Sequence, residues 1–361
     1  MSATTGATES PSSVSSATVI ELSSGTGVVP PSATIVPGRL HYHIERAVGG
    51  RPTAAESENG HSIAADRHRR RNVKCIGSVY QRMTLVSDGD GSPLPSLSRR
   101  LSPADVTMDL TMCGLLVERA AELARLYAEH GNWNDVEERW FDERRSNRST
   151  RGSSRKIYRV LTSRFKNAPP ALPNPSSLPA VFDECRTTRD KAQILYLYLV
   201  SDDSLVRYVV HEYVARLTGG KPAPLDFSNE TLVDILTQLE YADGDSFDYA
   251  GSTTERWCEG FRSVMREIGV LDGQQSVVGT SPSIGDISLL VAMDYAYESD
   301  DDEWFTAPRG LLYLFQPETR WQELFDRVSS TDAWEYVELH GDLDVRPSDE
   351  PYSWARNGGE S

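Results

Sequence analysis

Residues 113–166 read CGLLVERAAELARLYAEHGNWNDVEERWFDERRSNRSTRGSSRKIYRVLTSRFK and contain three amphipathic segments in succession. In the first, Gly114–His130, apolar residues recur every three or four positions, which places them on one side of an α-helix. Gly131 is suited to end this helix, because glycine adopts left-handed backbone angles readily. Asn132 is a suitable N-cap for a second helix, which carries Trp133, Val136 and Trp140 on one side.

The third segment predicts a helix from about Ser154 to Lys166, at the end of the stretch that carries most of the positive charge of residues 113–166. Between Arg144 and Lys166 there are nine bases and no acid, in a chain whose net charge is -16. At helical spacing, the side chains of Arg155, Arg159, Thr162 and Lys166 share one face opposite the apolar stripe. A basic helix preceded by Ser, Thr and Arg is suited to binding phosphate oxygens. The residues that we expect to contact nucleic acid are Arg148, Arg151, Arg155, Lys156, Arg159, Arg164 and Lys166.

Three helices with a basic third one follow the order of a helix-turn-helix unit, so we expect double-stranded DNA as the ligand. The link of about nine residues before the third helix is longer than the usual turn of such a unit. Three alternatives stay open. The basic helix pairs with the acidic body of the same protein, or it docks on an acidic partner protein as a scaffold, or it belongs to an RNA-binding helical module.

Downstream, the pattern predicts a proline-rich linker at 168–179, a second mainly helical domain at 180–345 and an acidic tail at 346–361. Ser228, and Ser252 or Thr253, are the expected N-caps in the second domain. Two short segments rich in aromatic and branched residues predict strands, namely Leu311–Phe315 and Trp334–His340. The expected helices are Thr188–Val200, Asp203–Leu217, Ser228–Tyr241, Thr253–Ile268 and Ile287–Tyr297.

Residues 1–107 lack helical periodicity and begin with a stretch dominated by Ser, Thr, Gly and Pro. Such a composition buries too little apolar surface to offset the entropy of ordering, so we expect mostly disorder there, with a weak strand at Ser78–Val86. Because periodic sequence begins only after Met108, a second hypothesis is an over-called start of translation. The intact mass of the native protein tests it.

Composition narrows the class of protein further. The chain has 53 acids and 37 bases, a balance typical of a salt-loving microbe or of an ordinary acidic protein rich in arginine. Its four cysteines are scattered without zinc spacing, which predicts a reducing cytoplasm and no metal site. We find no apolar run long enough to span a membrane, no phosphate-binding loop and no set of nucleophile, base and orienting group. We therefore expect a non-catalytic cytoplasmic protein without a cofactor.

The order and texture of several segments are similar to the BrxA family of the BREX phage-defence systems, over roughly residues 113–300. These segments are Gly114–Leu123, Asn132–Val136, Ser153–Ile157, Ala192–Tyr196, Val209–Val214 and Trp257–Leu271. The resemblance implies a helical accessory protein, from a haloarchaeon by its composition, with winged-helix-like or NusB-like domains that bind nucleic acid. It also implies other BREX subunits as partners, among them a DNA methyltransferase, an ATPase and an alkaline-phosphatase-like protein.

Overall fold

The computed structural model describes Leu94, Leu97 and residues 100–348, apart from 147–149, 215, 219–223, 298–303 and 340–341. Of the two units into which the chain divides, Met1–Asp66 and Arg67–Ser361, every described residue belongs to the second. Our predictions for Ser78–Val86, for Arg148 and for most of the acidic tail lie outside the described residues.

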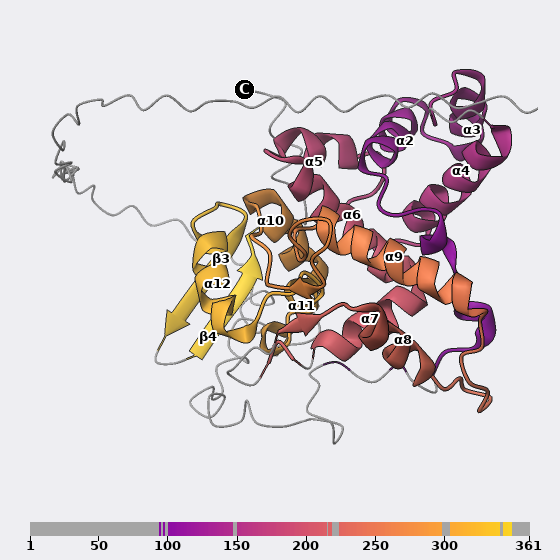
Figure 1. The fold of residues 1–361 in the computed structure, drawn as a ribbon. Helices are drawn as coiled ribbons and strands as arrows, with labels where there is room; N and C mark the ends of the chain where they lie inside the picture. The colour runs from indigo at the N-terminus through magenta and orange to yellow at the C-terminus, as the bar shows by residue number, and fades with distance from the viewer. Residues whose placement is uncertain are drawn as a thin grey trace, which may run out of the picture. The chain divides into compact units, whose positions relative to one another are not determined.

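The second unit is mainly helical (Figure 1). Its α-helices are α2 (Val117–His130), α3 (Trp133–Asp142), α4 (Arg151–Lys166), α5 (Leu178–Glu184), α6 (Thr188–Asp202), α7 (Ser204–Val214), α8 (Asn229–Thr237), α9 (Gly251–Glu267), α10 (Asp286–Ala296), α11 (Arg309–Tyr313) and α12 (Trp321–Ser329). Short 3-10 turns stand at η1 (Pro103–Asp105), η2 (Asp109–Thr111), η3 (Trp304–Thr306) and η4 (Glu318–Arg320). Within the described ranges, none of these helices is long and apolar enough to cross a membrane.

Two small antiparallel ribbons complete the described fold. β1 (Leu225–Asp226) pairs with β2 (Val278–Gly279), and β3 (Trp334–Leu339) pairs with β4 (Asp342–Pro347) in a hairpin. The hairpin follows α12 directly and packs on it through β3. The strand predicted at Trp334–His340 is thus confirmed, with its end at Leu339.

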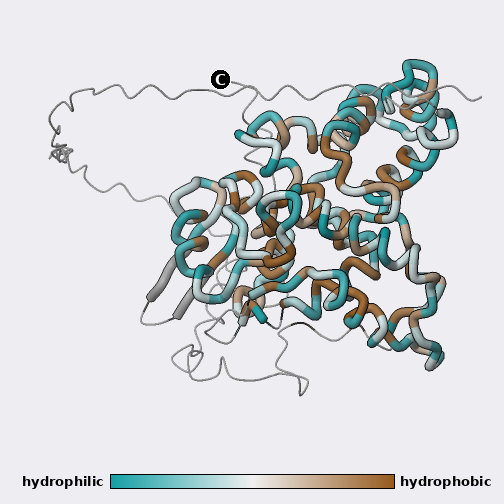
Figure 2. The backbone as a smooth tube through the Cα atoms, in the orientation of Figure 1, coloured by the Kyte–Doolittle hydropathy of each residue, from teal (hydrophilic) through white to brown (hydrophobic). Residues whose placement is uncertain are grey.

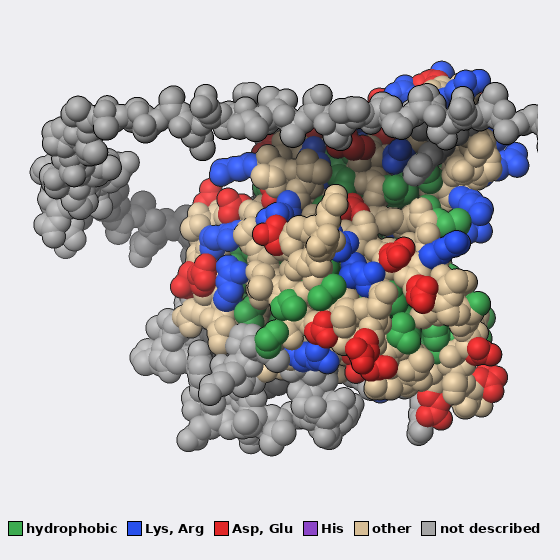
Figure 3. Space-filling view, in the orientation of Figure 1, with side chains coloured by type: hydrophobic (Ala, Val, Ile, Leu, Met, Phe, Trp, Pro, Cys, Tyr) green, Lys and Arg blue, Asp and Glu red, His purple; other side chains and the backbone are tan. Residues whose placement is uncertain are grey.

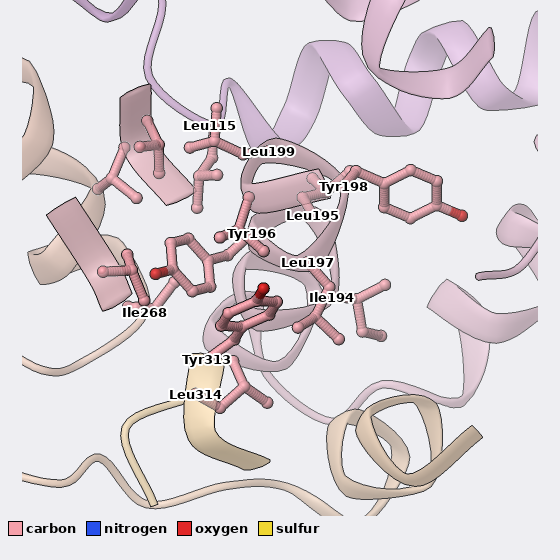
Figure 4. Close-up of a cluster of buried hydrophobic side chains, with 14 of the residues drawn as sticks. Leu115, Ile194, Leu195, Tyr196, Leu197, Tyr198, Leu199, Ile268, Tyr313 and Leu314 are labelled. Atoms are coloured by element: carbon pink, nitrogen blue, oxygen red, sulfur yellow. The ribbon is translucent and has the colours of Figure 1, made fainter. Parts of the chain in front are cut away.

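Helix α6 lies at the centre of the hydrophobic core. Residues Ile194–Val200 are all less than 5% exposed. Figure 4 shows the side chains of Ile194–Leu199 pointing outward from α6 in several directions. A helix that is apolar all round has to be covered on every side. α2, α4, α9, α10 and α11 all contact α6, so the two expected domains share this helix in one core. In contrast, hydrophilic and hydrophobic residues alternate along the outer helices (Figure 2).

Several local predictions are confirmed by the backbone. Gly131 ends α2 with a φ of 72°, and the Asn132 side chain accepts a hydrogen bond from the Asp135 N–H as the N-cap of α3. Ser228 likewise caps α8 by accepting from the Thr231 N–H. The proline-rich segment 168–179 buries Leu172 and lies against α6, where the Tyr198 hydroxyl donates to the Pro173 carbonyl.

Three predictions were wrong. Leu311–Phe315 is not a strand, because it spans the end of the short helix α11. The prediction failed because a short buried apolar run has no period that separates strand from helix. α9 begins at Gly251 with Ala250 as its N-cap, so neither Ser252 nor Thr253 caps it. α8 ends at Thr237, short of the expected Tyr241, and Glu240 then forms an isolated bridge with Ser246. Helices α5 and α12 were not predicted.

Candidate nucleic-acid interface

Helix α4 exposes a narrow strip of bases. Eight of its sixteen residues are buried, and α4 packs on α3 and α6. At about 100° per residue, the exposed side chains of the central turns occupy an arc only about 100° wide. That arc holds four bases and the small residues Gly152 and Ser163. We call the four bases the basic strip: Arg155, Lys156, Arg159 and Lys166.

The first turn of α4 adds to this positive surface. Thr150 is the N-cap, and its hydroxyl accepts a hydrogen bond of 3.2 Å from the Ser153 N–H. The helix therefore begins at Arg151, three residues before the predicted start at Ser154. A Cβ atom at Gly152 would meet nothing within 4 Å, so an anion can approach the backbone there. No acid occupies the first turn, so nothing on α4 itself neutralises the positive end of the helix dipole.

The strip residues differ in how they are held. Arg159 pairs with the Asp109 carboxylate of η2 at 3.2 Å, with 69% of the arginine side chain exposed. The Lys156 Nζ atom lies 3.5 Å from the Met112 sulfur, which is a weak acceptor. The Lys166 ammonium lies 5.3 Å from the centre of the Trp133 ring. Among the described residues, Arg151 and Arg155 form no ion pair.

Arg164 does not belong to the binding surface that we predicted. Its side chain is only 4% exposed, and its guanidinium donates to the carbonyls of Gly114 at 2.7 Å and Cys113 at 3.2 Å. Burial lowers the pKa of Arg164, and the nearby Asp203 carboxylate opposes this effect. The arginine therefore anchors the segment before α2, and its N–H groups are committed to protein carbonyls rather than available to a phosphate.

Thr162 is the second correction on α4. It is only 6% exposed, because at helical spacing it lies at the edge of the strip, between the exposed Arg155 and the buried Tyr158. Ser163 takes the expected place on the strip, and its hydroxyl donates to Asp202 at 3.2 Å. Arg145, upstream in the same nine-base stretch, forms ion pairs with Glu143 and Glu122. The hydrogen bond from Arg145 holds the pKa of Glu143 below its usual range.

Acidic side chains flank the strip on both sides. On the α3 side, Glu137, Glu138 and Asp142 share a shallow depression with Arg151. On the other side, a pocket of about 200 Å³ is lined by Thr107, Asp109, Val160, Ser163, Arg164, Asn167, Asp202 and Asp203. Figure 3 shows blue Lys and Arg side chains grouped over α4, with red ones close by. The acids on either side repel an anion, so the positive surface is confined to the strip and the first turn of α4.

Asp203 is the most perturbed acid beside the strip. It is 4% exposed, and burial raises its pKa to about 6 although two backbone N–H groups of α7 donate to its carboxylate. The Thr107 hydroxyl donates to the second oxygen at 3.1 Å. Nothing in the local sequence indicates this cluster, because Thr107, Asp109 and Asp203 are brought to α4 only by the tertiary fold.

The described residues also include cysteine and histidine side chains, which are common in catalytic and metal sites. Burial raises the pKa of the Cys185 thiol to about 12 and that of Cys258 to about 11, which suppresses their thiolate forms at neutral pH. No three His, Cys, Asp or Glu side chains in the described ranges are grouped as a metal site requires. His211 is buried and shares a hydrogen bond of 3.0 Å with the Tyr313 hydroxyl, as expected of a packing residue.

Comparison of the chain with protein-family models, with curated proteins and with solved structures gives no match.

Proposed function

We propose that this protein binds double-stranded DNA without catalysis, through phosphate contacts made by the basic strip. One observation carries the proposal: in a chain of net charge -16, the exposed arc of α4 holds only bases and small residues. Guanidinium and ammonium groups bind phosphate oxygens by charge-assisted hydrogen bonds. Arg151 and the open N-terminal turn extend the strip by a further phosphate contact.

The shape of the strip favours a particular way of binding. Because α4 is buried around most of its circumference, it does not insert into a groove as a recognition helix does. The distance along the helix from Arg155 to Lys166 is about 16 Å, and the major groove of B-form DNA is about 12 Å wide. The strip therefore reaches the phosphates on both rims of the groove. Contacts of this kind carry little sequence information.

The same argument favours DNA over double-stranded RNA. The major groove of A-form RNA is deep and narrow, so its two phosphate rims do not match the length of the strip. An RNA-binding module stays the alternative. A scaffold that docks on an acidic protein is the other alternative, since exposed arginines also pair with carboxylates.

We also propose that the protein is an accessory subunit of a BREX-type defence system. The support is the resemblance of its segments to the BrxA family, together with the order of elements near the C-terminus. Helices α10, α11 and α12 followed by the hairpin of β3 and β4 match the order of a winged-helix domain. The exposed residues of α12 include Glu323 and Asp326, so we assign the contact with phosphates to α4 instead.

Fluorescence anisotropy with duplex DNA and matched RNA, at several KCl concentrations, tests the proposal. Five phosphate contacts set an upper limit of about 4 to 5 on the magnitude of the slope of log K against log salt. The double variant Arg155→Glu, Arg159→Glu is expected to lose affinity by about a hundredfold or more, because the Arg155 contact of about 1.5–3 kcal/mol is removed and two carboxylates then face the phosphates. The matched control reverses two exposed arginines elsewhere, Arg186 and Arg256.

The outcomes separate the candidate functions. Equal losses in both double variants show that only the mean charge matters, which contradicts the strip. Tighter binding to RNA than to DNA favours the RNA-binding module. If no polymer binds and the Arg155→Glu, Arg159→Glu variant fails to co-purify with BREX subunits, the scaffold replaces our proposal.

A further inference from the structure

We propose that Arg159 and Lys156 form a phosphate subsite, which the Asp109 carboxylate occupies in the free protein. The inference rests on the proposed function, since the phosphate belongs to the nucleic acid that binds the strip. The Asp109 oxygen lies 3.2 Å from a terminal nitrogen of Arg159, which is hydrogen-bonding distance for a phosphate oxygen as well. Lys156 is one helical turn earlier on the same face, beside Met112 of the same segment.

The backbone of η2 positions the Asp109 carboxylate over α4. Two amides downstream, those of Met112 and Cys113, donate to the Asp109 carbonyl at 3.0 and 2.9 Å. Leu110 is 2% exposed and its carbonyl lies against Gly260 of α9, where a Cβ atom would approach to 2.1 Å. Only glycine permits this contact without a backbone shift. The η2 turn is therefore fixed on α9 and holds Asp109 over α4.

The pair between Asp109 and Arg159 is well suited to exchange. Both side chains are partly exposed, at 28% and 69%, and an ion pair in such a setting adds only about 0–1 kcal/mol to stability. A phosphate carries the same charge as the carboxylate and brings further contacts along the strip. It displaces Asp109 from Arg159 at small cost, and the carboxylate then turns toward the pocket that it lines.

This arrangement makes Asp109 the residue that sets the affinity and salt dependence of the strip. When a phosphate displaces Asp109 from Arg159, a counterion leaves the DNA, but the freed Asp109 carboxylate attracts a cation in return, so the net release is small. Arg155, which forms no ion pair among the described residues, releases a full counterion. The two arginines of the strip therefore contribute unequally, and the inequality disappears when Asp109 is made neutral.

The test compares Asp109→Asn with Asp248→Asn, which removes the same charge from an exposed residue between α8 and α9. With a 20-base-pair duplex, Asp109→Asn is expected to bind about threefold to tenfold more tightly and to steepen the salt slope by about 0.9, as one added phosphate contact does. Asp248→Asn is expected to change both quantities only slightly. Thermal melts of both variants establish that they are folded.

A second variant pair makes the coupling explicit. Arg159→Gln is expected to weaken binding less than about threefold in the natural protein but about tenfold in the Asp109→Asn background, because only there is Arg159 unpaired. Equal effects of Arg159→Gln in the two backgrounds overturn the inference, and so does equal affinity of Asp109→Asn and Asp248→Asn.

Retention on heparin supplies a readout that does not depend on nucleic acid. Asp109→Asn is expected to elute at higher KCl than both the natural protein and Asp248→Asn, because heparin is also a polyanion. If no duplex binds but this shift is present, the anion subsite stands and the DNA-binding function falls. If both asparagine variants elute together, the subsite itself is refuted.

Discussion

Helices α4 and α12 occupy similar places in their parts of the chain but expose opposite charges. Each is the third helix of a local series, α2 to α4 and α10 to α12, and each buries one apolar side. α4 exposes bases over about 100° of its circumference, whereas α12 exposes Gln322, Glu323 and Asp326 over an arc of similar width. The order of the helices is therefore a weak guide to ligand class, and the charge of the exposed arc is the stronger one.

Both helices also place an arginine against the core, and the two arginines differ in burial. Arg164 of α4 is 4% exposed and donates to two carbonyls. Arg327 of α12 has 32% of its side chain exposed, donates to the Ile284 carbonyl at 2.7 Å and pairs with Asp286 at 3.1 Å. We infer that Arg164 contributes much more to the stability of the fold than Arg327 does.

The largest expected effect follows from this difference. Arg164→Met is expected to lower the free energy of unfolding at pH 7 by about 3–5 kcal/mol, because it removes the Arg164 donor from two carbonyls and the positive charge beside the buried Asp203. Arg327→Met is expected to cost only about 1 kcal/mol, since water replaces its contacts. Urea unfolding of both variants measures the difference. Similar losses would show that burial does not distinguish the two arginines.

Much of the fold around α4 could be predicted from the sequence. Gly131 and Asn132 mark the border of α2 and α3 because their effects are local: one residue adopts positive φ and the other caps a helix within three residues. Apolar spacing likewise located α4. The same reasoning was wrong at Leu311–Phe315, where α11 ends, because five consecutive apolar residues contain no usable period.

The candidate site was less accessible from the sequence. Counting charges found the strip, but it did not separate the exposed Arg159 from the buried Arg164, five residues later on the same helix. That distinction depends on Gly114, whose carbonyl accepts from Arg164 across fifty positions of sequence. The neutralising Asp109 was missed for the same reason, because only the packing of η2 on α9 brings it to Arg159.

The next test is the pH dependence of stability. The buried side of α4 faces Asp203, and burial raises the pKa of this carboxyl group to about 6. In the unfolded chain this group titrates near 3.8, so between about pH 4 and 6 the folded state binds more protons. Stability from this group is therefore present below pH 4 and lost as pH rises to 6, by an amount on the order of 2 kcal/mol.

Asp203→Asn removes this titration while keeping an oxygen that accepts from the α7 amides. The difference in free energy of unfolding between the natural protein and Asp203→Asn is expected to change between pH 4 and 6 and to stay flat above pH 7. Urea unfolding at pH 4.5, 5.5 and 7.5 measures it. A difference that is constant across this range would mean that the Asp203 pKa is not raised in the folded state.

The smallest expected effect tests the comparison of the two exposed arcs directly. Starting from the Arg155→Glu, Arg159→Glu variant, Glu323→Arg with Asp326→Arg turns the arc of α12 basic. We expect duplex affinity to recover by about tenfold, the equivalent of about 1.4 kcal/mol, because two bases on an exposed helical arc reach phosphates together. Asp243→Arg with Asp248→Arg adds the same charge in the loop before α9 and is expected to recover less than about threefold. Equal recovery by both pairs would mean that net charge governs the affinity, and the basic strip of α4 would then lose its special role.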